Sequence, residues 1–169
     1  MSAINRHYLY PSMLKVAGDG LQIHTILGSC VALCLFDQKL SLGGMNHFML
    51  PFWNGKGLAS PKYGNIAIQR LVDMMLEKGS QKRNLIAKVF GGANVLDFSG
   101  QDVHIGTRNV TLAFDMMEDM AIKVAAQSTG GERGRKIVFD TATGMVQQRY
   151  IDRIKMHRMP VPEARQKLS

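Results

Sequence analysis

The residues of this sequence best suited to nucleophilic or metal chemistry are its two cysteines and five histidines. Cys30 and Cys34 stand four residues apart in a strand-like run, which separates their Cα atoms by about 13 Å, whereas a disulfide needs about 7 Å or less. We therefore expect both thiols to be free. The histidines, at positions 7, 24, 47, 104 and 157, show no ligand spacing such as His-Glu-x-x-His, so we expect neither a metal nor a cofactor.

The two cysteines differ in their surroundings. Cys34 lies between two leucines, which is typical of a small apolar residue in a core. Cys30 follows Gly28-Ser29 at a junction between strands, where a glycine lets the chain turn and neighbouring amides can face a bound oxygen. A thiol of ordinary pKa, near 8.5, needs a histidine, a positive charge or a helix N-terminus to be ionised at neutral pH. Cys30 is therefore the candidate nucleophile.

His47 is the candidate partner for this thiol. If Val31–Phe36 and Gly43–Leu50 pair as a hairpin, His47 lies beyond the start of the first strand, close to Cys30. The geometry permits a Cys/His dyad. A structural interpretation stays open for each residue taken alone, because buried thiols and hydrogen-bonded histidines are commoner than catalytic ones.

The elements that must position these residues follow from hydrophobic periodicity and turn signals. A helix is expected from a cap at Asn65 to Gly79, and a second from about Asn109 to about Met120. The ranges expected to be strands are Leu21–Leu27, Val31–Phe36, Gly43–Leu50, Leu85–Phe90, Ile122–Ala126, Arg135–Asp140 and Met145–Ile151. This order predicts an α+β protein with a mixed or largely antiparallel sheet and its helices packed on one side.

Two glycine-rich segments have two interpretations each. Gly91-Gly92-Ala93-Asn94 either lines the site with backbone or forms a tight turn at a strand end. The segment Gly130–Lys136 is not a phosphate loop, because its lysine is not followed by Ser or Thr and no strand-to-helix context surrounds it. We interpret it as the approach to a strand, with its cations as candidates for contact with a substrate.

The length of 169 residues predicts a single domain over 1–169, with a folded core over about 10–150 and a basic tail over 151–169. The formal net charge is +8, and the segment from Arg149 onward holds six Lys or Arg against two acidic residues. Half of the net charge therefore lies in the last segment. Such basicity suits a nucleic acid, a membrane surface or an acidic protein.

Other features of the sequence narrow the classes of partner that this positive charge suits. The longest apolar run, Cys30–Phe36, is far shorter than the roughly 18 residues of a membrane span, so no membrane insertion is expected. The N-terminus carries Arg6 where a signal peptide would be apolar, so we expect a cytoplasmic protein. We expect no nucleic-acid partner, because neither an aromatic stacking platform nor a recognised motif accompanies the charge.

Five ordered blocks resemble the chemoreceptor glutamine deamidase family, CheD, and together span Leu27 to Lys136. They read Leu27-Gly28-Ser29-Cys30-Val31-Ala32, Gly43-Gly44-Met45-Asn46-His47-Phe48-Met49-Leu50-Pro51, Lys88-Val89-Phe90-Gly91-Gly92-Ala93-Asn94, Ile105-Gly106-Thr107-Arg108-Asn109 and Gly130-Gly131-Glu132-Arg133-Gly134-Arg135-Lys136. The resemblance implies a three-layer αββ sandwich similar to that of deamidating toxin cysteine hydrolases. It also implies an enzyme that converts particular glutamines of methyl-accepting chemotaxis receptors to glutamates without a cofactor.

The resemblance assigns roles to single residues. The nucleophilic Cys of the family matches Cys30, and its general-base His matches His47. Its third catalytic member is a Thr shortly upstream of the Cys, which matches Thr25, with His24 as the alternative six positions before Cys30. In this mechanism the thiolate attacks the carboxamide carbon, His47 moves the protons, and the backbone amides of Ser29 and Cys30 stabilise the oxyanion.

The resemblance also leaves an alternative of another class. Some members of the family bind CheC-type phosphatases of the chemotaxis response regulator, so a non-catalytic docking role is the second hypothesis. The intact Cys30 and His47 favour the enzyme.

Overall fold

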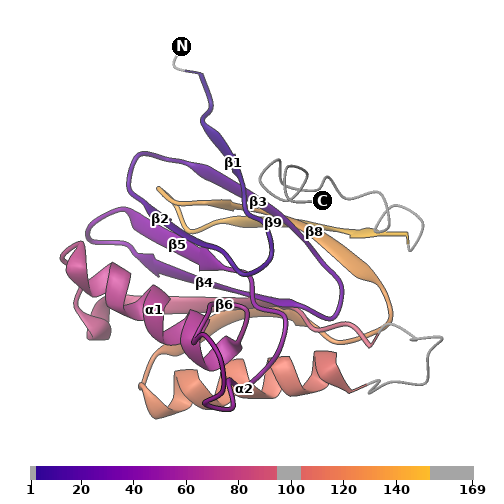
Figure 1. The fold of residues 1–169 in the computed structure, drawn as a ribbon. Helices are drawn as coiled ribbons and strands as arrows, with labels where there is room; N and C mark the ends of the chain where they lie inside the picture. Colours follow the sequence, from indigo (N-terminus) through magenta and orange to yellow (C-terminus); the bar gives the residue numbers. More distant parts are fainter. Residues whose placement is uncertain (1–2, 95–103, 153–169) are drawn as a thin grey trace, which may run out of the picture.

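The computed structural model describes residues 3–94 and 104–152, so the basic tail from residue 153 onward lies outside the described residues. Within these described residues, two helices and two β-sheets form three layers, and one short 3-10 helix connects the first helix to the next strand (Figure 1). The elements in chain order are β1 (Arg6–Tyr8), β2 (Leu14–Ala17), β3 (Gln22–Leu27), β4 (Val31–Asp37), β5 (Leu42–Asn46), α1 (Gly64–Glu77), η1 (Lys82–Asn84), β6 (Leu85–Gly91), α2 (Ile105–Asp119), β7 (Lys123–Thr129), β8 (Gly134–Asp140) and β9 (Val146–Ile151).

Both sheets are mixed. The five-stranded sheet has the order β2-β5-β4-β6-β7, in which only β6 and β7 run parallel. The four-stranded sheet has the order β1-β3-β8-β9, in which only β1 and β3 run parallel. Helices α1 and α2 cover one face of the five-stranded sheet, and the four-stranded sheet lies on its other side (Figure 1). The expected α+β class and αββ layering are confirmed.

Strand β4 shows why the apolar run around Cys34 belongs to a central strand. All seven residues of β4 are buried, because the strand lies in the middle layer and is covered on both faces. Val31, Leu33 and Leu35 pack in the core beneath the helices, whereas Ala32 and Cys34 pack in the core between the sheets. Alternation along one strand therefore sorts its side chains into two separate cores.

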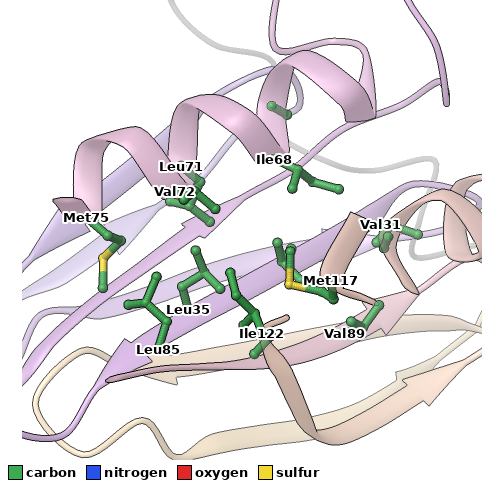
Figure 2. Packing of buried hydrophobic residues seen from close by; sticks show 14 of the residues in the cluster. Val31, Leu35, Ile68, Leu71, Val72, Met75, Leu85, Val89, Met117 and Ile122 are labelled. Atoms are coloured by element: carbon green, nitrogen blue, oxygen red, sulfur yellow. The ribbon is translucent and has the colours of Figure 1, made fainter. Parts of the chain in front are cut away.

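The core beneath the helices depends on the periodic face of α1. Ile68, Leu71, Val72 and Met75 recur at helical spacing and are fully buried, and Figure 2 shows them pointing toward Leu35 and its neighbours on the sheet. Fully burying each such side chain contributes about 1.5–3 kcal/mol. This layer fixes the strands that carry the candidate site.

Several predicted boundaries needed correction. Helix α1 begins at Gly64 with Tyr63 as its N-cap, not at Asn65, because the Asn65 Oδ1 accepts a hydrogen bond from the Trp53 N–H instead. Helix α2 begins at Ile105, four residues before the predicted start. The strand predicted over Gly43–Leu50 ends at Asn46, so His47 follows it directly.

Strands β1 and β2 lie in a segment where no element was predicted. They have three and four residues, too few for a period to be recognised. The residue after β1, Leu9, is fully buried and packs in the core between the sheets. In the described ranges, 3–94 and 104–152, neither helix is long and apolar enough to cross a membrane.

Candidate active site

Thr25 and His47 meet between the two sheets. Thr25 belongs to β3 of the four-stranded sheet and points inward with Ile23 and Leu27, while His47 directly follows β5 of the five-stranded sheet. The Thr25 Oγ1 and the His47 Nδ1 lie 2.7 Å apart. Both side chains are almost completely buried, so this hydrogen bond is shielded from water.

The proton positions in this pair follow from a third group, the Leu9 carbonyl. The Thr25 hydroxyl donates its only proton to the Leu9 oxygen at 2.7 Å. Its oxygen can then only accept from His47, so the proton of the neutral imidazole must be on Nδ1. The His47 Nε2 keeps its lone pair, and this buried atom has no hydrogen-bond partner among the described residues. His47 is therefore held as a base with Nε2 free.

Cys30 lies on the chain that crosses from the four-stranded to the five-stranded sheet. Val31 and Phe48 form an antiparallel bridge, with N–H to O distances of 3.0 and 2.9 Å. In this register Cys30 and His47 are diagonal neighbours on the same face, a placement that typically separates two residues by about 7–8 Å and their Cβ atoms by somewhat less. Cys30 and Cys34 are both free thiols, and Cys30 is partly exposed.

His24 occupies the opposite face of β3 from Thr25. Successive strand residues alternate between faces, and the exposure pattern along β3 alternates accordingly. Burial lowers the pKa of His24, and the nearby Lys136 and Arg6 lower it further. Of the two candidates for a third site residue, the structure brings only Thr25 to His47.

Burial holds both members of the Cys30 and His47 pair in their neutral forms at neutral pH. It lowers the pKa of His47 to about 4. Although part of Cys30 is exposed, burial of its sulfur raises the pKa of the thiol to about 12, opposed by a hydrogen bond from the N–H of Cys30 itself. A neutral thiol and a neutral imidazole can act together only if the thiol proton passes to His47 as the sulfur attacks.

Asn109 fastens the two segments that carry Cys30 and His47. Its side chain lies on the buried face of α2, and its Nδ2 donates to the Ser29 carbonyl and to the Met49 carbonyl, each at 3.0 Å. One carbonyl directly precedes Cys30, and the other lies two residues after His47. Asn109 is therefore a positioning residue for the site. Sequence reasoning placed it at the helix start, although a polar residue on an apolar helical face was a usable signal.

The segment after β6 supports the Cys30 turn from the other side. The N–H of Gly92 donates to the Cys30 carbonyl at 2.8 Å, and the N–H of Ala93 donates to the Gly28 carbonyl at 3.0 Å. Gly91 has a φ of +108°, and a Cβ at this position would collide with the Cys30 carbonyl oxygen. The glycines here allow backbone to approach backbone, so this segment lines the site with its main chain.

The backbone amides of Ser29 and Cys30 remain the candidate oxyanion donors. No hydrogen bond from either N–H to another residue is found in the described part of the chain. The Cys30 N–H lies close enough to its own Sγ to influence the thiol pKa. Donors without a committed partner beside a nucleophile are suited to an oxygen that becomes negative during attack.

The glycine-rich segment that leads into β8 packs beside this turn through Arg135, the second residue of β8. Arg135 is buried and donates to the Ser128 Oγ at 3.1 Å, the Gly130 carbonyl at 2.9 Å and the Gly91 carbonyl at 3.4 Å. Arg133 lies over the Tyr150 ring at 4.5 Å. The Arg135 guanidinium is thus occupied by the Ser128 hydroxyl and by main-chain carbonyls. Residues 3–94 and 104–152 contain no group of three ligand-type side chains able to hold a metal.

Comparisons with known proteins identify close relatives. The family model "CheD chemotactic sensory transduction" matches residues 49–150. A Trichlorobacter lovleyi protein named "Probable chemoreceptor glutamine deamidase CheD" is 51% identical over 145 residues, 86% of this chain and 90% of its own. Proteins of the same name from Sulfurimonas denitrificans and Rhodospirillum rubrum are 44% and 42% identical, over 88% and 89% of this chain and 96% and 85% of theirs.

Proposed function

This chain belongs to the CheD family of chemotactic sensory transduction, and we propose that it is a cysteine-dependent deamidase of glutamine side chains in methyl-accepting chemotaxis receptors. The observation that carries the proposal is the hydrogen-bonded series from the Leu9 carbonyl through Thr25 to His47. In this series the His47 Nε2 keeps the lone pair that is needed to accept the proton of the Cys30 thiol. The names of the relatives support the substrate class.

The proposed reaction has two halves. The Sγ of Cys30 attacks the carboxamide carbon while the His47 Nε2 accepts the thiol proton, and the oxyanion is stabilised by the Ser29 and Cys30 amides. The His47 imidazolium then protonates the leaving nitrogen, so that ammonia departs and a thioester remains. Water, deprotonated by His47, attacks the thioester and yields glutamate and the free thiol.

Thr25 has the role of the third residue in this mechanism. When His47 becomes an imidazolium, its Nδ1–H still donates to the Thr25 Oγ1, so the ring orientation does not change during proton transfer. The hydroxyl is neutral, so it orients the ring without the charge that an aspartate would supply.

Ammonia release and the Gln-to-Glu mass increase of a receptor cytoplasmic fragment test the proposal. We expect turnover with the intact protein and none with Cys30→Ala or His47→Ala, with both variants folded by circular dichroism. Unchanged turnover by Cys30→Ala would refute the nucleophile. Binding of a CheC-type phosphatase and a cytoplasmic location stay predictions from the family.

A further inference from the structure

The loop of residues 51–63 lies within the connection between β5 and α1, begins four residues after His47 and has no part in the chemistry described above. We propose that this loop is the docking surface for the α-helical receptor segment that carries the target glutamine, through apolar and acidic side chains of that segment. The inference rests on the proposed function and adds to it the surface that selects the substrate.

The loop is anchored at the site. The N–H groups of Met49 and Leu50 both donate to the Lys62 carbonyl, at 2.8 and 3.1 Å. Met49 is also the residue whose carbonyl accepts from Asn109. Both ends of the loop are therefore tied to the strand extension that contains His47, so a partner held by the loop lies beside the site.

The loop is also internally ordered. The Trp53 indole donates to the Lys56 carbonyl at 3.0 Å, and the Trp53 N–H donates to the Asn65 Oδ1 at 3.0 Å. The Arg70 guanidinium of α1 donates to the Ala59 carbonyl at 2.8 Å. A loop held by hydrogen bonds within itself and to α1 has already lost much of its conformational entropy, so binding costs less.

Two large apolar side chains of this loop face solvent. Phe52 is 60% exposed and Leu58 is 89% exposed, and Leu58 is the most exposed large apolar residue among those described. The tip is open, because a Cβ built on Gly55 or Gly57 would meet nothing within 4 Å. Single exposed apolar residues are ordinary, but an aromatic and a leucine together on an ordered loop beside a reaction centre suit a protein partner.

The positive charge of this region favours an acidic partner. From Met49 to Val72 the sequence contains Lys56, Lys62 and Arg70 and no Asp or Glu, and all three cations are exposed. Each deamidation leaves a carboxylate on the substrate segment, so a segment of this kind becomes more acidic as it is processed. Apolar anchors flanked by cations are therefore complementary to an acidic amphipathic helix.

Binding and turnover of a receptor cytoplasmic fragment test the loop. In a Cys30→Ala background, which prevents turnover, we expect Phe52→Ser with Leu58→Ser to weaken binding by about tenfold or more. In the otherwise intact protein the same pair should raise KM by a similar factor and leave kcat, and hydrolysis of a short glutamine peptide, unchanged. Lys56→Glu with Lys62→Glu should weaken binding and its salt dependence together.

The matched controls are exposed side chains in two turns outside this loop. Leu40, in the β4–β5 turn, and Met145, in the β8–β9 turn, are 48% and 62% exposed, and Leu40→Ser with Met145→Ser should leave binding unchanged. Lys39→Glu with Lys82→Glu is the corresponding charge control.

The outcomes separate the two proposals. Deamidation of the receptor with unchanged affinity and KM in the Phe52/Leu58 variant overturns the docking surface and leaves the proposed function standing. Loss of self-association in that variant, with KM unchanged, assigns the loop to a contact between copies and also overturns it. Tight binding that depends on the loop, without any turnover by the intact protein, overturns the deamidase. Absence of any binding overturns both.

Discussion

One hydroxyl group sets the protonation state on which the proposed chemistry of His47 depends. Thr25 donates to a main-chain carbonyl and accepts from the imidazole. Because a carbonyl oxygen can only accept, the peptide group fixes the direction of both hydrogen bonds. A carboxylate would hold the ring more strongly but would favour the charged imidazolium. A threonine keeps His47 a neutral base in a site where burial already lowers its pKa to about 4.

Replacement of Thr25 by valine, which has the same shape without the acceptor, tests the role of the hydrogen bond between His47 and Thr25. The Nδ1–H of His47 then loses its buried partner, and the tautomer that frees Nε2 is no longer favoured. We expect kcat to fall by about 100-fold or more. Thr25→Ser should restore most of the activity, and His24→Gln, on the other face of β3, should leave it near that of the unmodified protein. Equal losses in Thr25→Val and His24→Gln would contradict the assignment.

The buried neutral His47 also predicts a dependence of stability on pH. Its pKa is about 4 in the folded protein against an ordinary value of 6.5, so between these values the unfolded chain binds a proton that the folded protein excludes. The contribution of His47 to the free energy of unfolding is therefore fully present above pH 6.5. It decreases by about 3 kcal/mol as the pH falls toward 4.

Urea unfolding of the protein and of His47→Asn across this range measures the contribution. The loss of unfolding free energy on acidification should be smaller in the variant, because asparagine does not titrate. Parallel curves for the two proteins would show that His47 is not buried as a neutral base.

At the scale of elements, the site is assembled from pieces that no single element contains. Thr25 comes from one sheet and His47 from the other, Cys30 lies on the crossing between them, and α2 supplies Asn109 from behind. The hairpin register that places Cys30 beside His47 was predictable, because apolar alternation and a turn define it locally. The Leu9 carbonyl was not, since it depends on a three-residue parallel strand. Asn109 could have been noticed as a polar residue on an apolar helical face, but its two partners depend on packing between distant segments.

Asn109→Leu tests the connection between α2 and the site. The substitution is close to isosteric but leaves the Ser29 and Met49 carbonyls without their donor, and each unsatisfied buried group costs about 1–3 kcal/mol. We expect a loss of unfolding free energy in urea, together with a lower kcat in the fraction that remains folded. Thr111→Leu, at an exposed position of the same helix, is the control and should change neither. If the variant is destabilised but keeps its full kcat, Asn109 does not position the site.

For the whole molecule, layering explains both what could be predicted and where chemistry takes place. The order of elements predicted the α+β class with helices on one side, because helical and strand periods are local signals, whereas the three-layer αββ arrangement was implied by the resemblance of the family blocks. The helix layer and the middle sheet share one core and the two sheets share another. The site lies at one end of the second core, where burial shifts the pKa of Cys30 and His47 in opposite directions.

The net charge of +8 is also a property of the whole molecule. We expect association with an acidic receptor surface to weaken as ionic strength rises, while hydrolysis of a short glutamine peptide does not change. Neutralising Arg149, Arg153, Lys155 and Arg158 together should reduce both the affinity and its salt dependence, measured by titration calorimetry at several salt concentrations. If neither changes, the excess charge has no part in docking.

Trapping the acyl-enzyme tests the central claim most directly. With a receptor fragment and hydroxylamine, a thioester on Cys30 should transfer its acyl group, so that mass spectrometry finds the glutamyl hydroxamate at the glutamines that otherwise become glutamate. Cys30→Ala should give neither product. Glutamate without any hydroxamate, or ammonia release that persists in Cys30→Ala, would contradict nucleophilic attack by Cys30.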